Sequence, residues 1–380
     1  MTKKKDALPL KNSTTVKGVL APPLYKEILE IAETPFVNYK NFKNKTILIT
    51  GAGGFIAYYL ICAFMLRNDL YGDNITIIAL ARNEQRLKQK YGSLYARDDF
   101  APVISDICDA NVIENLLAAA SGKSLKADFI IHAASQASNQ QFENDPVGTI
   151  NANLSGTVNV LEYARKVASE GVLFISSLKV YGTQPAKTAA LTESNIGYLD
   201  ITSYKNCYAM GKRASETLCA CYAQQYSLNI KIARPAYIYG ASSLSDDRVW
   251  AQFIANAVKG ENILLKGNGK PYRSFCYVTD TATALLKILT DGLQGMAYNI
   301  ADADSNITIR EFADCAAAAC PQKQLKKIFA NAADATEPHD YKQPTENCEI
   351  LDAQPLLSLG WEPTINVPEG IKRAIEILKS

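Results

Sequence analysis

The chain has 380 residues, of which 48% are hydrophobic and 21% charged, and its formal net charge is +2. A chain of this size buries a large core in one or two domains, and its balanced charge gives no reason to expect a nucleic-acid partner. No apolar run reaches the roughly 18 residues of a membrane span, no signal-peptide core is present, and cysteines without zinc-ligand spacing indicate a cytoplasmic protein with reduced thiols and no metal site.

Residues 1–44 are expected to form an N-terminal extension. Its basic start, MTKKK, is typical of a solvated tail, and the segment PPLYKEILEIAE (22–33) predicts a short helix. The extension carries no motif, so a clasp between lobes and an oligomer contact are both open as its role.

From residue 45 onward, short apolar runs alternate with helical patterns. Strands that are buried on both faces of a parallel sheet read as near-continuous apolar runs, so this alternation predicts a Rossmann-type, doubly wound α/β sheet. Long helices are expected at 156–168 and 212–226, and their apolar residues on more than one face favour a homodimer. The expected strands cover residues 46–50, 75–80, 101–106, 127–133, 171–177 and 229–234.

After residue 234 the rhythm loosens into turn-rich segments and further helices, which indicates a smaller, interleaved lobe. The expected NAD(P)-binding domain covers 45–236, and 273–303 returns to it. The expected substrate-binding lobe covers 237–272 and 304–380.

The first expected strand runs directly into a glycine cluster, in TILITGAGGFIA. A glycine turn between a strand and a helix leaves backbone N–H groups at the positive end of the helix, where a pyrophosphate binds well. Gly51 permits the tight turn, Gly54 lets the backbone approach the phosphates, and the small Ala57 stands at the third glycine position. The turn therefore predicts a dinucleotide site, with Phe55 and Ile56 opening the helix.

No carboxylate follows the second expected strand, where one would normally hold the adenosine ribose; Arg82 stands there. An arginine suits a 2′-phosphate, which favours NADP over NAD, and a surface arginine on the next helix is the alternative. Asp106 and Ile107, after the third strand, suit the adenine edge, although a plain turn aspartate fits the same pattern.

A third cluster combines a strand end with a helix. Tyr208 and Lys212, four residues apart in CYAMGK, lie on one face of a helix, and the strand FISS ends in Ser176 and Ser177. A phenol with a pKa near 10 is a poor base at neutral pH, and the ammonium of a lysine together with a cationic nicotinamide would lower its pKa. The serine hydroxyls could bond a substrate oxygen, and this order of elements makes the Tyr–Lys pair a specific constellation rather than a chance match.

With these motifs in place, the chain from about residue 45 to 380 resembles the extended short-chain dehydrogenase/reductase family of nucleotide-sugar epimerases and dehydratases. The resemblance rests on TGAGGFIA, DFIIHAAS, DPVGTINANLSGTVNVLEYAR, FISSLKVYG, YAMGK, ARPAYIYG, GNGKPYRSFCYVTD, YNIAD and LGWEP, which occur in family order.

The resemblance implies a role for each matching residue. Tyr208 would be the catalytic base, Lys212 its partner on the nicotinamide ribose, and Ser177 the hydroxyl that shares the substrate proton. Arg273 would meet the nucleotide diphosphate, and Tyr237 stands where relatives often place a substrate-contacting asparagine. The remaining cofactor-lining residues would be Ala133, Ala134, Ser135, Asn153 and Ser176.

Besides Tyr237, two further positions depart from the family pattern. Leu178 and Lys179 stand where 4,6-dehydratases carry an Asp–Glu pair, and decarboxylases usually carry a glutamate at the position of Lys179. A 4-epimerase that transiently oxidises C4 of a nucleotide sugar needs the fewest additional acids or bases, so it is the first expectation. A UDP-glucuronate-type decarboxylase, a 4,6-dehydratase and a 4-keto reductase are the alternatives, and the intact serine, tyrosine and lysine argue against a non-catalytic binding module.

Overall fold

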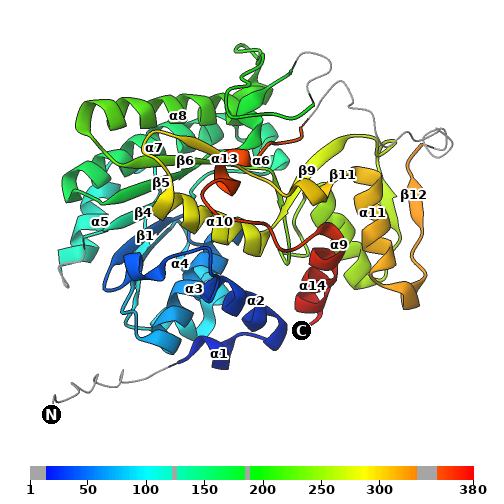
Figure 1. Cartoon of the computed structure of the whole chain (residues 1–380), viewed down its shortest axis with the longest axis horizontal. Helices are drawn as coiled ribbons and strands as arrows, with labels where there is room; N and C mark the ends of the chain where they lie inside the picture. Colours follow the sequence, from blue (N-terminus) through cyan, green and yellow to red (C-terminus); the bar gives the residue numbers. More distant parts are fainter. Residues whose placement is uncertain (1–13, 122–125, 185–188, 332–348) are drawn as a thin grey trace.

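The computed structural model describes residues 14–121, 126–184, 189–331 and 349–380 (Figure 1). The basic tail MTKKK lies outside these residues. No helix in the described ranges is long and apolar enough to cross a bilayer.

A seven-stranded sheet forms the centre of the large domain, with the strand order β10-β6-β5-β4-β1-β2-β3. Every neighbouring pair is parallel, so the predicted doubly wound sheet is confirmed. The strand order reverses between β1 and β4, and ligands of such sheets bind outside the carboxyl ends of the strands at this point. The strands are β1 (Thr46–Thr50), β2 (Thr76–Ala81), β3 (Phe100–Ile104), β4 (Phe129–His132), β5 (Gly171–Ile175), β6 (Ile230–Pro235) and β10 (Ala297–Ile300).

Helices cover both faces of this sheet, as Figure 1 shows. Alternate residues of β1 enter two separate cores, Ile47 and Ile49 on one face and Leu48 on the other, and all three are fully buried. This double burial explains the continuous apolar run of the strand. The first face packs on α3 (Phe55–Tyr71), α4 (Glu84–Tyr91) and α10 (Val278–Asp291), and the second on α5 (Val112–Ser121), α7 (Pro146–Val167) and α8 (Cys207–Tyr226), with the short α6 (Asn139–Asn144) before α7.

The smaller lobe contains a three-stranded sheet, β11-β9-β7, and a two-stranded sheet, β12-β8. Of residues 273–303, expected to return to the large domain, α10 and β10 pack on the large sheet, while β9 pairs within the small one. The domain division itself stays a prediction. The elements are β7 (Tyr237–Tyr239), α9 (Val249–Lys259), β8 (Ile263–Leu265), β9 (Tyr272–Tyr277), β11 (Asn306–Thr308), α11 (Ile309–Ala318), β12 (Lys327–Phe329), α13 (Gln354–Leu357) and α14 (Val367–Lys379).

Short 3-10 helices occupy several connections, and two of them border the site. The loop after β5 forms η3, and the segment before α8 forms η4. Their ranges are η1 (Tyr39–Phe42), η2 (Gly92–Ala96), η3 (Leu178–Tyr181), η4 (Tyr204–Asn206), η5 (Ala303–Ser305) and η6 (Pro321–Lys323).

The described part of the extension packs against both parts of the molecule. It contains α1 (Val16–Val19) and α2 (Pro22–Ala32), and α2 contacts α3, α10 and α14. Glu27 on α2 is 2% exposed, and its carboxylate accepts hydrogen bonds from the hydroxyls of Tyr59 on α3 and Tyr277 on β9. The described part of the extension thus contacts helices beside the large sheet and a strand of the small sheet, and its role as a clasp or an oligomer contact stays a prediction.

Glu27 is expected to make stability depend on pH, because burial raises its pKa from an ordinary value of 4.5 to about 7. The folded chain therefore holds this proton more tightly than the unfolded chain. The corresponding stability is complete below about pH 4.5 and is lost as the pH rises through about 7, at a cost of roughly 3 kcal/mol at most. Glu27→Gln should remove this loss. Urea unfolding at pH 5 and pH 8 would measure it, with Glu376→Gln on the exposed side of α14 as control. An unchanged pH slope in Glu27→Gln would contradict the assignment.

Candidate active site

The glycine turn lies between β1 and α3, at the point where the strand order reverses. Gly51 has a φ of +68°, and a Cβ there would lie 2.9 Å from the backbone nitrogen of Ala134, so the turn lies against the end of β4. Gly54 is the N-cap of α3, and no side chain caps this helix. A free helix N-terminus behind a tight glycine turn fits the pyrophosphate of a dinucleotide.

The residues predicted for the adenosine end lie together beyond β2 and β3. The guanidinium Nη1 of Arg82 is 3.7 Å from Oδ2 of Asp106, and both side chains are about half exposed. Asp106 accepts a hydrogen bond from the backbone N–H of Cys108, and Ile107 is buried. The arrangement leaves a charged pair at the surface next to the expected ribose position.

The loop after β4 is fixed by two polar side chains. The hydroxyl oxygen of Thr50 accepts hydrogen bonds from the backbone N–H groups of Ala133 (3.1 Å) and Ala134 (3.0 Å). The hydroxyl of Ser135 donates to Oδ1 of Asn153 on α7 at 2.9 Å. Asn153 therefore ties this loop to α7.

Ser177, Tyr208 and Lys212 come together where β5 meets the first turn of α8. Ser177 is hydrogen-bonded to Tyr208, and Lys212 lies 5.9 Å from the centre of the tyrosine ring. Lys212 is 2% exposed, and its ammonium donates to the carbonyl of Ile175 at 2.7 Å. Burial lowers the pKa of Lys212 to about 7.

The environment of Tyr208 differs from the electrostatic prediction. Burial raises its pKa; the hydrogen bond from Ser177 and the charges of Lys179 and Arg248 oppose this rise. The sequence assigned the opposing charge to Lys212, which is itself desolvated, and the charge of Glu216 only partly offsets that burial. The ring of Tyr208 also stacks on Phe142, with centroids 4.7 Å apart.

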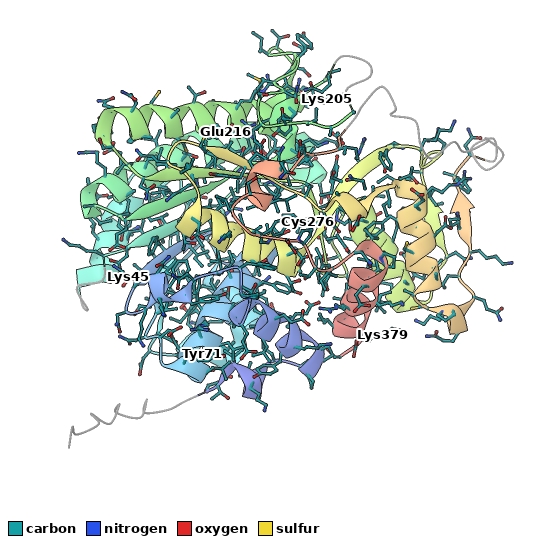
Figure 2. The ribbon with its side chains drawn as sticks, viewed as in Figure 1. Lys45, Tyr71, Lys205, Glu216, Cys276 and Lys379 are labelled. Atoms are coloured by element: carbon teal, nitrogen blue, oxygen red, sulfur yellow. The ribbon has the colours of Figure 1, made fainter. Side chains whose placement is uncertain are left out.

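Ser176, expected to line the cofactor, is buried, and its hydroxyl is bound to another side chain of the protein. Its hydroxyl donates to Oε1 of Glu216 at 2.5 Å, and the guanidinium of Arg234 binds both oxygens of the same carboxylate. Glu216 lies midway along α8 (Figure 2). The network joins the end of β5 to β6 and α8, and it holds the backbone from which Ser177 projects.

Tyr208 lines a cavity of about 320 Å³ between the β5 loop, the start of α8 and the lobe. Lys179, Lys205, Arg273 and Glu349 line it as well, and Figure 2 shows Lys205 just before α8. Of the predicted substrate residues, Arg273 borders this cavity directly and Tyr237 bonds to its wall through Lys179.

Sequence reasoning missed Glu349, Phe142 and Arg248. Glu349 lies outside all of the motifs quoted above. It reaches the site because its backbone forms an isolated β-bridge with that of Arg273. Glu349 is a carboxylate that the fold brings beside Lys179, one of the two positions where 4,6-dehydratases carry their Asp–Glu pair.

The sequence pattern of the NAD-dependent epimerase/dehydratase family matches residues 47–301. The chain belongs to this family. The predicted family, its enzymatic nature and its nicotinamide cofactor are thereby confirmed. The large parallel sheet and the glycine turn of this family member agree with that assignment.

Curated relatives of this family member are nucleotide-sugar decarboxylases. The chain is 30% identical over 343 residues to UDP-glucuronic acid decarboxylase 6 of Arabidopsis thaliana, which covers 89% of the chain and 90% of the relative. It is 27% identical over 361 residues to UDP-glucuronic acid decarboxylase 1 of Danio rerio, and the match covers 93% of this chain and 79% of that relative.

Solved structures show the same fold at lower identity. A UDP-glucose 4-epimerase of Thermotoga maritima with UDP-glucose superposes with a TM-score of 0.71 at 21% identity, covering 88% of this chain and 98% of that one. A dTDP-glucose 4,6-dehydratase of Bacillus anthracis with NAD superposes with a TM-score of 0.69 at 20% identity, and the match covers 88% of this chain and 96% of that one. The homodimer and the cytoplasmic location stay predictions.

Proposed function

We propose that this family member is an NAD(P)-dependent decarboxylase of a nucleotide-linked uronic acid, acting through oxidation at C4. One observation carries the proposal: the chain is 30% identical to a UDP-glucuronic acid decarboxylase over 89% of its length. The site has a proton-transfer set for a hydroxyl, Ser177 and Tyr208, and Leu178 and Lys179 in place of the acid–base pair of a dehydratase. The decarboxylase relatives support this outcome rather than epimerisation.

Decarboxylation fits such a site because loss of carbon dioxide from the 4-keto sugar removes no proton from C5, so the glutamate that decarboxylases usually carry at the position of Lys179 is not needed as a base there. Tyr208 as phenolate would take the proton of the C4 hydroxyl, with Ser177 sharing it, and a nicotinamide cofactor held at the glycine turn would supply the reversible hydride transfer at C4. The resulting ketone is β to the C6 carboxylate, so the C5–C6 bond breaks, carbon dioxide leaves, and the electron pair moves to the C4 oxygen as an enolate. Protonation at C5 by water gives a 4-keto pentose, and Tyr208 gives its proton back to the C4 oxygen when the hydride returns to C4.

The remaining predicted residues support this chemistry by position. The turn at Gly51 and Gly54, with Phe55 and Ile56, would hold the pyrophosphate. The loop of Ala133, Ala134 and Ser135 would lie along the cofactor, Lys212 would bind its ribose, and Arg273 would meet the diphosphate of the substrate.

The reaction is tested by incubating the protein with NAD⁺ and UDP-glucuronate and analysing the products by mass spectrometry and NMR. Loss of carbon dioxide with formation of a UDP-pentose is the expected result. A product of unchanged mass with a changed NMR spectrum would instead establish the 4-epimerase, and a loss of water the dehydratase.

Arg82 is expected to strengthen NADP(H) binding more than NAD(H) binding. A charge-assisted contact of its exposed guanidinium with a 2′-phosphate is worth roughly 1.5–3 kcal/mol. Arg82→Ala should therefore weaken NADP(H) by about tenfold or more and NAD(H) little, in fluorescence titrations. Arg86→Ala, on the following helix, is the charge-matched control. Equal losses for both cofactors in Arg82→Ala would remove the assignment and leave NAD as the cofactor.

A further inference from the structure

Glu349 is the centre of a charge cluster at the wall of the cavity. Its Oε1 accepts a hydrogen bond from the ammonium of Lys179 at 2.6 Å, and its Oε2 lies 2.6 Å from Nε of Arg273. The hydroxyl of Tyr237 donates to Oε2 at 2.5 Å and accepts from Lys179 at 2.7 Å. Both carboxylate oxygens are thus bound between two cations.

Lys179 contacts this carboxylate and also faces the cavity. Burial raises the pKa of Glu349, but Lys179 and Arg273 outweigh burial and lower it, so the carboxylate is ionised. The side chain of Lys179 is still 42% exposed, and it lines the partly enclosed cavity. A substrate carboxylate that reaches this ammonium would be attracted to it, because opposite charges attract most strongly where water is displaced.

The position of Lys179 suits one particular carboxylate of the substrate. Lys179 and Tyr208 line the same cavity, and the ammonium is close enough for its charge to act on the phenol. If the C4 oxygen of a uronic acid contacts Tyr208, the carboxylate carbon is separated from C4 by only one ring atom. It therefore falls within reach of a neighbouring lysine.

We propose that Lys179 determines specificity for a uronic acid by binding its carboxylate, and that Glu349 is an internal counter-ion which gives up this ammonium when the substrate binds. Arg273 keeps its contact with Glu349 or turns to the diphosphate. The inference rests on the proposed function. It assigns the selection of an acidic sugar to Lys179, which stands where decarboxylases usually carry a glutamate.

The test measures binding without turnover. In a Tyr208→Phe protein with NAD present, calorimetry would compare UDP-glucuronate with UDP-glucose, which lacks the carboxylate. The expected preference for UDP-glucuronate is at least about tenfold. Adding Lys179→Met should weaken the binding of UDP-glucuronate by a similar factor and the binding of UDP-glucose by less than about threefold. Adding Glu349→Gln should tighten UDP-glucuronate several-fold, because the competing carboxylate is gone.

Lys205→Met is the matched control, since it removes a lysine from another side of the same cavity. It should change the affinities for both ligands by similar factors, and Lys179→Arg should restore part of the preference. The proposal is overturned if the Tyr208→Phe protein shows no preference, or if Lys179→Met weakens both ligands equally. Weaker binding of UDP-glucuronate to Glu349→Gln would also overturn it.

Failure of the proposed function would look different. It would appear as an absence of carbon dioxide release by the protein with native Tyr208, whatever the binding preference of the variants. Carbon dioxide release without a change of preference in Lys179→Met would leave the function standing and reject only the role of Lys179.

Discussion

Tyr208→Phe is expected to fold and bind cofactor like the native protein while turnover falls by on the order of 10²–10⁴. The substitution removes only the hydroxyl, which is hydrogen-bonded to Ser177, and it keeps the ring that stacks on Phe142. The expected loss is therefore a loss of proton transfer, because the packing of the first turn of α8 is unchanged.

The electrostatics of the site indicate how the phenol becomes a base. Burial raises the pKa of Tyr208, and Ser177, Lys179 and Arg248 oppose the rise without cancelling it. The cofactor-free protein therefore holds a protonated Tyr208 at neutral pH. A positive nicotinamide ring beside the phenol would supply the missing stabilisation of the phenolate, so the pH–rate profile should show an acid limb that moves to higher pH in Lys179→Met.

Single-turnover rates with the native substrate would measure these effects. Ser177→Ala should cost less than Tyr208→Phe, because the substrate hydroxyl can reach the phenolate directly. Lys212→Ala should impair both turnover and cofactor affinity. Tyr204→Phe is the matched control, since this tyrosine precedes Tyr208 by one helical turn and is 58% exposed. Near-native turnover in Tyr208→Phe would show that another group is the base.

Much of the fold could be predicted because its signals are local. The strand expected at 46–50 matches β1 at both ends, and the other expected strands differ from the observed ones by one or two residues at most ends. Burial on both faces makes each strand a continuous apolar run, and this needs no knowledge of its neighbours. The glycine turn and the Tyr–Lys spacing are local in the same way.

The residues that sequence reasoning missed depend on contacts between distant segments. Lys179 and Glu349 are 170 positions apart, and their pairing follows from the return of the chain beside β9. From the sequence alone, Lys179 is notable only because decarboxylases usually carry a glutamate at its position, and no role for the lysine itself follows. The effect of Lys212 was overestimated because sequence spacing gives the distance of a charge along the helix but not its burial. Desolvation, which decides the pKa of both Lys212 and Tyr208, is a property of the folded site.

Gly54→Val is expected to weaken NAD(H) binding by at least about 100-fold while the sheet remains folded. The backbone N–H of Gly54 closes the turn on the carbonyl of Gly51 at 2.8 Å, and a Cβ at residue 54 would lie 2.9 Å from that same oxygen. The side chain must push the carbonyl away, which opens the turn and turns the N–H groups at the start of α3 away from a common point. Loss of two charge-assisted hydrogen bonds to a pyrophosphate, each worth roughly 1.5–3 kcal/mol, gives an effect of at least this size.

The adjacent glycine provides the control for this experiment. A Cβ at Gly53 would meet no atom within 4 Å, so Gly53→Ala should bind NAD(H) within about threefold of the native protein. Fluorescence titration with NADH measures both affinities, and circular dichroism checks that both variants are folded. Gly54→Ala places the same Cβ against Gly51 with less bulk, so it tests the turn even where valine prevents folding. If a folded Gly54 variant binds NADH with native affinity, the turn contributes only to packing, and the pyrophosphate must bind elsewhere along the edge where the strand order reverses.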